Sequence, residues 1–356
     1  MRKYLMSVCL AAACCHAQDN GGAASGNSPL KVDVLTRVGY YGERVHGETD
    51  HSASGFKGDY LFLFVRGDIS RQFSYSWRQR LNKSIDKSHV FDATDWLYVD
   101  YRPTDRWTLS AGKQVVLIGG YEYDRNPLDV FAPSEFWMNI GCFQFGASAQ
   151  YRTGSGNDAL TAQVAASPFR TDAHNDLLSY NLQWNGHHGI WHPMYSVNMI
   201  EHRPGRYISY LALGNRFTLG SVPLGEGKGE VPRVAVEADF MNRAASRQTV
   251  FFRDCSVVAN VDWRIVPRVQ VYGKVAYDVN RAIGTDADLD IMPGTELTTV
   301  AAGVEYYPLK TELVRLHAGV AHTTGRNANP GGSQVDGKLQ MAVSLSAKIP
   351  VFKIDR

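Results

Sequence analysis

Apolar and polar residues alternate along the chain from Leu30 onward, in segments of about ten residues separated by turn residues. A period of two is that of a β-strand, whose successive side chains point to opposite faces. In residues 73–82, aromatic and aliphatic side chains occupy one face, whereas serine, arginine and asparagine occupy the other. One face suits lipid and the other suits water, which is the weak but repeated pattern of a transmembrane β-barrel.

Alternation alone is also found in soluble β-sandwiches. Two further features favour a membrane barrel. Short turns such as 70–72 and 103–105 come between longer connections such as 42–58 and 280–296, so we expect periplasmic turns at one end and extracellular loops at the other. Aromatic residues lie near strand ends, where interfacial girdles form: Tyr40, Phe73, Trp107, Tyr151, Trp184, Trp191, Trp263, Tyr277 and Tyr306.

The pattern predicts an all-β fold, a 16-stranded antiparallel transmembrane β-barrel with an inward-folded third loop. The sixteen strands are expected at 31–41, 59–70, 73–83, 95–102, 106–117, 142–152, 159–167, 177–185, 190–200, 206–218, 232–243, 249–264, 268–279, 297–307, 313–323 and 338–351. A long connection from Asn215 to Pro232 is predicted where a short turn is expected. The sequence leaves the inward and outward faces of strands ten and twelve open.

The first residues have the order of a secretory signal peptide: Arg2 and Lys3, then an apolar stretch, then small residues before a cut after Ala17. We therefore expect a signal peptide at 1–17, a flexible leader at 18–28 and the barrel at 29–356. The mature chain would keep only two cysteines, Cys142 and Cys255, and a single bridge between them is left open. The chain ends four residues after Phe352, whereas many outer-membrane barrels end on an aromatic residue.

Composition narrows the function classes. With 37 Lys and Arg against 35 Asp and Glu, the formal net charge is only +2, so no basic field indicates a nucleic-acid partner. Beyond the first 20 residues no apolar run approaches the roughly 18 residues of a spanning helix. No nucleophile elbow, glycine-rich phosphate loop or metal-spaced set of Cys and His occurs, so we predict neither an enzyme nor a cofactor.

The connection after the fifth strand, at about 118–141, is rich in aromatic and acidic residues. We expect it to fold into the lumen, because a 16-stranded barrel leaves an aqueous channel that something must narrow. At this point the sequence resembles the phosphate-selective porin O and P family of outer-membrane porins in Gram-negative bacteria. The resemblance is carried by 109–114 (LSAGKQ), 119–122 (GGYE) and 126–130 (NPLDV).

The resemblance implies a homotrimer in the outer membrane whose third loop lines the constriction, with lysines and arginines drawing an anion through in phosphate-selective members. Here the loop carries Glu122, Asp124, Asp129 and Glu135 against a single Arg125. The inward positions of the first six strands, by contrast, form a basic wall: Lys31, Arg37, Arg66, Arg78, Arg80, Arg102 and Arg152, against Asp33, Asp68 and Asp100.

An acidic loop that faces an arginine-rich wall would create a transverse field across the lumen, by analogy with general diffusion porins. We place Arg66, Arg78 and Arg80 near the middle of their strands and predict that they oppose the loop carboxylates Glu122, Asp124 and Asp129. The alternative is that these arginines line a wet lumen and pair with inward carboxylates of neighbouring strands.

The sequence therefore predicts an outer-membrane porin, a passive diffusion channel for small hydrophilic solutes and ions. An anion- or phosphate-selective porin is one alternative, and a non-channel barrel that serves as an adhesin or scaffold is another. Asp286, Asp288 and Asp290 resemble a calcium loop but lack its glycine and its final acid, so a solvated loop is favoured. His187 and His188, without a third ligand in view, are expected at the surface.

Overall fold

The computed structural model describes residues 28–83, 90–224, 229–244, 251–282, 291–309, 311–329, 332 and 334–354. The predicted signal peptide and the acidic motif at 286–290 lie outside these residues. No helix in the described part of the chain is long and apolar enough to cross a membrane.

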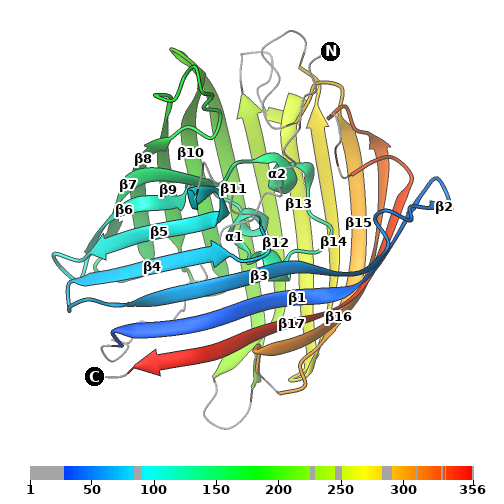
Figure 1. Ribbon diagram of the computed structural model, residues 1–356, viewed down its shortest axis with the longest axis horizontal. Coiled ribbons are helices and arrows are strands. Elements are labelled where there is room, and N and C mark those ends of the chain that lie inside the picture. Colours follow the sequence, from blue (N-terminus) through cyan, green and yellow to red (C-terminus); the bar gives the residue numbers. More distant parts are fainter. Residues whose placement is uncertain are drawn as a thin grey trace.

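Sixteen long strands form one closed antiparallel sheet, in which each strand pairs with its neighbours along the chain and β1 pairs with β17 (Figure 1). A two-residue strand, β2 (Glu48–Thr49), extends the connection between β1 and β3. The long strands are β1 (Leu30–Val45), β3 (Gly55–Asp68), β4 (Phe73–Arg80), β5 (Thr94–Tyr101), β6 (Trp107–Val115), β7 (Phe143–Arg152), β8 (Asp158–Ala166), β9 (Leu178–Gly186), β10 (Trp191–Arg203), β11 (Arg206–Pro223), β12 (Glu230–Ala244), β13 (Asp254–Val266), β14 (Val269–Asn280), β15 (Glu296–Tyr306), β16 (Val314–Arg326) and β17 (Lys338–Ile354).

All sixteen predicted strands are therefore confirmed, although several begin or end a few residues from the expected position. The long connection expected from Asn215 to Pro232 is mostly strand, because β11 continues to Pro223 and β12 begins at Glu230. The backbone stays paired from Ser209–Ala244 to Pro223–Glu230, through the glycine and asparagine positions that suggest a turn in the sequence.

The two faces of the sheet differ as predicted. Side chains such as Leu182, Val197 and Val320 are exposed on the outer face, and polar side chains such as Asn181 and Asn198 are buried on the inner one. The faces of β11 and β13, which the sequence left open, are now defined. Even-numbered residues point inward in both: Ile208, Tyr210 and Ala212 in β11, and Ser256, Val258 and Asn260 in β13. The β11 residues are apolar because they belong to a buried cluster with residues of the inward loop.

Many of the predicted girdle residues lie at the end of the barrel with the short turns. There Phe73 stacks on Tyr101, with ring centroids 4.7 Å apart, and Trp107 lies 5.1 Å from Tyr151. Trp263 and Tyr306, at the same end, are exposed on the outer face. Rings with one apolar and one polar edge are suited to the headgroup level of a bilayer.

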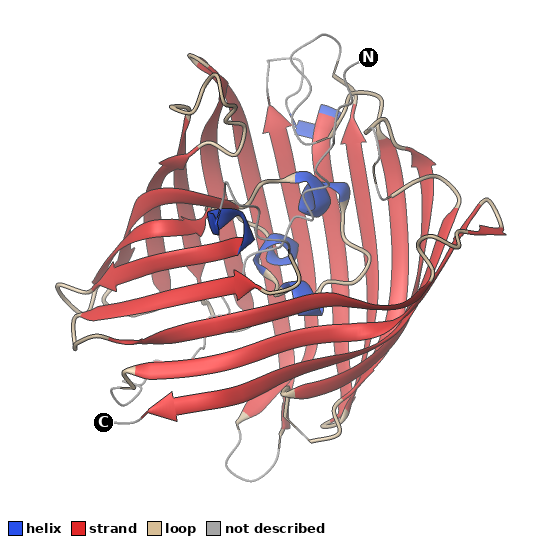
Figure 2. Ribbon diagram, in the orientation of Figure 1, coloured by secondary structure: helices blue, strands red, loops and turns tan. Residues whose placement is uncertain are grey.

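Connections at this end are short, such as 69–72, 102–106 and 267–268, whereas most at the opposite end are longer, and only the turn at 204–205 there is tight. The longest, 116–142, turns into the barrel, and Figure 2 shows its helices inside the ring of strands. It contains α1 (Tyr121–Asp124), a 3-10 turn (Pro127–Asp129) and α2 (Glu135–Asn139). Two further 3-10 turns, Val90–Ala93 and Phe251–Arg253, lie in other connections. Cys142 and Cys255 are both buried and form no disulfide with each other, so the bridge left open in the sequence is absent.

Candidate channel constriction

The inward loop, residues 116–142, leaves β6 and is first tied to β8 and β10. The amide group of Gln163 accepts from the backbone N–H of Leu117 at 3.1 Å, and Asn198 Nδ2 donates to the Leu117 carbonyl at 2.7 Å. The N–H of Gly119 donates to Ser196 Oγ at 2.8 Å. Polar side chains on the barrel wall thus satisfy backbone groups that a buried loop would otherwise leave unpaired.

Gly119 and Gly120 allow the loop to lie against this wall. A Cβ atom on Gly119 would stand 2.7 Å from the carbonyl oxygen of Met194, and Gly120 has a φ of 113°. A side chain at position 119 would therefore collide with β10, and only glycine adopts the φ of Gly120 without strain. Directly after it, Asp239 of β12 accepts the N–H groups of Tyr121 and Glu122, each at 2.8 Å, and so fixes the start of α1.

Lys274 of β14 holds the middle of the loop. Its ammonium group forms an ion pair with Glu122 and donates to the carbonyl of Ala132 at 2.8 Å. Glu122 also accepts the N–H of Ser134 at 3.0 Å, and Ser134 Oγ accepts the N–H of Trp137 at 3.2 Å as the N-cap of α2. One buried lysine therefore joins two parts of the loop through a single carboxylate.

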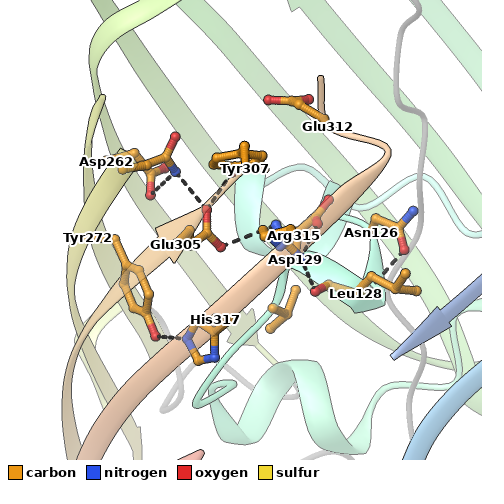
Figure 3. Close-up of polar contacts among 12 residues, drawn as sticks. Asn126, Leu128, Asp129, Asp262, Tyr272, Glu305, Tyr307, Glu312, Arg315 and His317 are labelled. Carbon is orange, nitrogen blue, oxygen red and sulfur yellow. Dashed lines mark hydrogen bonds and ion pairs between the residues drawn. The ribbon is translucent and has the colours of Figure 1, made fainter. Parts of the chain in front are cut away.

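Two arginines from adjoining walls hold the segment 127–130. Arg37 of β1 donates to the carbonyls of Pro127, Leu128 and Val130 at 3.0–3.2 Å. Arg315 of β16 donates to the Leu128 carbonyl and lies 2.7 Å from Asp129 and 3.2 Å from Glu305, as Figure 3 shows.

Beside this segment, Phe131 stacks on His317, with ring centroids 3.4 Å apart, and His317 Nε2 lies 2.8 Å from the Tyr272 hydroxyl (Figure 3). The loop is thus packed as well as hydrogen-bonded on the β14–β16 side of the lumen.

The far side of α2 contacts the connection between β16 and β17. Glu135 is buried and accepts from the side-chain amides of Asn139 at 2.9 Å, Asn327 at 3.0 Å and Asn329 at 3.0 Å. Burial, and then the nearby carboxylate of Asp278, raises the pKa of Glu135 to about 7.

Below the loop, towards the short turns, lies a cavity of about 1580 Å³. Its lining combines apolar side chains with many polar and charged ones, and nine carboxylates and six cationic side chains are among the described residues that line it. The carboxylates are Glu122, Asp124, Asp129, Asp158, Glu237, Asp239, Asp262, Glu305 and Glu312, and the cations are Arg125, Arg152, Arg216, Lys274, Arg315 and Lys348.

The predicted constriction arginines lie elsewhere. Arg78 and Arg80 both bind Asp95 of β5, at 2.7 and 2.6 Å, and Arg66 lies 3.5 Å from Asp33 of β1. These are carboxylates of neighbouring strands, as the alternative interpretation expected. The predicted depth is also wrong for two of them, because Arg66 lies two residues from the end of β3 and Arg80 is the last residue of β4.

The predicted partners of two loop carboxylates are also wrong, since Glu122 binds Lys274 and Asp129 binds Arg315. Asp124 lines the cavity. Of the other basic-wall residues, Lys31 lies 3.8 Å from Asp33 and Arg102 donates to Ser74 Oγ at 2.7 Å. Arg37 holds the loop, as described above, and Arg152 lines the cavity.

The cationic residues that sequence reasoning missed are Arg216, Lys274 and Arg315. Each occupies an inward position of a later strand, so the alternation that identified the wall of the first six strands could have found them. The alternation could not show that Arg125 of the loop binds carboxylates of two adjacent strands. These are Glu237 of β12, at 2.6 Å, and Asp262 of β13, at 2.7 Å.

No group of three or more His, Cys, Asp or Glu side chains in the described part of the chain is arranged to hold a metal ion. His187 and His188 are exposed in the turn after β9, as expected. Their rings contact His192 and Asp158, respectively, at 2.7 and 3.0 Å.

Residues 39–191 match the model of the family described as phosphate-selective porin O and P. A search of curated proteins found no match.

The fold is similar to that of solved bacterial porins. The trimer form of OmpT, an outer membrane protein of Vibrio cholerae, superposes with a TM-score of 0.58 and 12% identity, over 90% of this chain and 99% of that one. An engineered variant of the Rh. blastica porin gives 0.53 and 10% identity, over 90% and 100%. Over residues 39–191 the chain thus resembles the phosphate-selective porin O and P family, and as a whole it has the fold of an outer-membrane porin.

Proposed function

We propose that the protein is a passive diffusion channel for small hydrophilic solutes and ions in the outer membrane of a Gram-negative bacterium. The observation that carries this proposal is the cavity of about 1580 Å³ below a loop anchored to the barrel wall. Many charged and polar side chains line it beside apolar ones, and fifteen charged groups favour water and solutes over a plug of packed apolar residues.

The loop sets the aperture. Its backbone is held by side chains of β1, β8, β10, β12, β14 and β16, so it crosses the lumen in one fixed path. Size selection then follows from the space that the loop leaves free, and no substrate is transformed. The porin fold supports a channel over an enzyme.

Charge is segregated across the cavity. Arg216 of β11 and Arg125 bind Glu237 on one side, whereas Asp129 and Glu312 lie on the side of β15 and β16. A solute with separated charges would turn in the field between them. Such a field would correspond to the transverse field expected from the sequence, with Asp129 among the predicted acids and with Arg125 and Arg216 in place of the predicted arginines.

Assembly and export are part of the proposal. We infer a homotrimer surrounded by outer-membrane lipid, supported by the OmpT structure that is titled a trimer form. Export would use the predicted signal peptide at 1–17. The alternative, a phosphate-selective porin, is supported by the description of the matching family alone.

Single-channel recording of the refolded mature protein in a planar bilayer tests the proposal. We expect discrete open levels, and liposomes containing the protein should swell in small sugars and progressively less in larger ones. A folded, heat-modifiable barrel that conducts no ions and admits no sugar would contradict the channel and favour an adhesin or scaffold.

A further inference from the structure

Arg78 and Arg80 of the β3–β5 wall are largely withdrawn from passing anions. The Arg78 guanidinium is buried between Asp95, at 2.7 Å, and the ring of Trp96, 3.8 Å from its centroid. Arg80 shares the same carboxylate. A charge that is buried and paired attracts an ion in the lumen weakly, because its field is cancelled by the partner at short range.

The cations that hold the loop are also committed to carboxylates. Arg315 lies between Asp129 and Glu305, and Arg125 lies between Glu237 and Asp262. Each of these two arginines thus contacts two carboxylates. The cluster around Arg315 carries a net negative charge, whereas Arg216 also binds Glu237 and brings the cluster around Arg125 to neutrality.

On the β15–β16 side of the cavity, the exposed charged side chains are carboxylates. The side chain of Glu312 is 64% exposed and that of Asp129 is 47% exposed, whereas their partners Arg264 and Arg315 are 1% and 10% exposed. A hydrated ion in the cavity therefore meets carboxylate oxygens first, with the guanidinium groups behind them. Figure 3 shows Arg315 enclosed between Asp129 and Glu305.

The opposite side of the cavity, near β11 and β12, carries an exposed cation. The net charge that an ion meets therefore depends on the whole lining. Arg216 is 37% exposed and its partner Glu237 only 3%. Among the described residues of the lining, however, carboxylates still outnumber cations by nine to six. A cavity with a net negative lining and low-dielectric walls concentrates counter-ions of positive charge.

We propose that the channel prefers cations to anions, and that the exposed carboxylates Asp129 and Glu312 set this preference. The inference deepens the proposed diffusion channel and rests on it. It assigns this chain a selectivity opposite to the one that the name of its matching family suggests.

The test is the reversal potential of the intact refolded channel in a KCl gradient. We expect potassium to be at least about twofold more permeant than chloride. Glu312→Gln should lower the ratio, and Asp129→Asn combined with it should bring the ratio close to one. Asp172→Asn is the matched control, because it removes the same charge from an exposed connection outside the cavity and should leave the ratio unchanged.

Glu312→Gln also guards against misfolding, since its side chain is mostly exposed and its amide oxygen can still accept from the buried Arg264. A wild-type ratio at or below one, or a ratio that the control alters as much as the cavity variants, would overturn the proposal. In either case open levels would still be recorded, so the failure would concern selectivity alone. Absence of any conductance would instead overturn the channel, and this inference with it.

Discussion

Two walls of the lumen carry inward arginines and carboxylates, but they use them differently. On the β3–β5 wall, Arg78 and Arg80 converge on Asp95, and Arg78 is also packed against the ring of Trp96. Beside the β15–β16 wall, Asp129 of the inward loop and Glu312 of the β15–β16 connection stay exposed to the cavity, while their partners Arg315 and Arg264 are buried. Inward parity therefore does not make a charged residue part of the ion path. The first wall stabilises the barrel, and the second wall faces the solutes.

Removing Asp95 should give the largest effect and break the first half of this comparison. Asp95→Ala leaves two arginines without their shared, buried carboxylate, which should cost about 3–5 kcal/mol of folding free energy. The measurement is the urea or heat midpoint of the refolded barrel in detergent. Glu312→Ala, beside the other wall, should lower the free energy of unfolding by less, about 1 kcal/mol, because its contact with Arg264 is 3.5 Å long and its own side chain is mostly exposed. Equal losses in both variants would contradict the division of roles.

Releasing the loop should come next. Lys274→Met leaves Glu122 buried without its cation and should destabilise the protein by about 3 kcal/mol. The freed loop should also raise open-channel noise and admit larger sugars in liposome swelling. Combining it with Glu122→Gln should recover part of the loss, because the double variant buries no unpaired charge. A double variant whose loss equals the sum of the single ones would mean that the two side chains do not act together.

Titration of Glu135 should have a smaller effect on the contact between the loop and the β16–β17 connection. Its folded pKa of about 7 exceeds the value of an unfolded glutamate, so the folded state binds the extra proton and stability from this group is lost as pH rises through about 7. The loss should be about 2–3 kcal/mol between pH 4.5 and 8. The measurement is the unfolding midpoint as a function of pH, and the midpoint of Glu135→Gln should not fall over this pH range as that of the wild type does. A variant with the same pH profile as the wild type would refute the assignment.

Neutralising an exposed cation should have the smallest effect and sharpen the comparison. Arg152→Gln removes a positive charge from the cavity lining, so the preference for potassium should rise by about 1.5-fold. Arg102→Gln, whose side chain binds Ser74 away from the cavity, is the control and should leave the reversal potential unchanged. A shift of equal size in the control would show that any inward-facing charge affects selectivity, whether or not it lines the cavity.

Much of the fold could be predicted from the sequence, because alternation repeats in every strand and one slip would expose the polar face to lipid. The strand count followed from it, whereas the inward loop was predicted from the aromatic and acidic residues of 118–141. The partners in the constriction could not be predicted, since parity says which side a residue faces but not its height or what stands across the lumen. Arg66 illustrates the limit on height, because it lies near the end of its strand. Arg125 illustrates the limit on partners, because it binds carboxylates of β12 and β13. The Gly119–Gly120 pair marked the loop, yet its reason, close contact with the carbonyl of Met194, needed the structure.

The anchoring of the loop to β1, β8, β10, β12, β14 and β16 has a mechanical consequence. A segment attached at so many points around the circumference acts as a cross-brace that resists flattening of the barrel. The aperture is then static on the timescale of ion passage, and flow needs no rearrangement of the protein. Conductance should rise with temperature only as steeply as that of the bulk electrolyte, whose mobility is set by the viscosity of water.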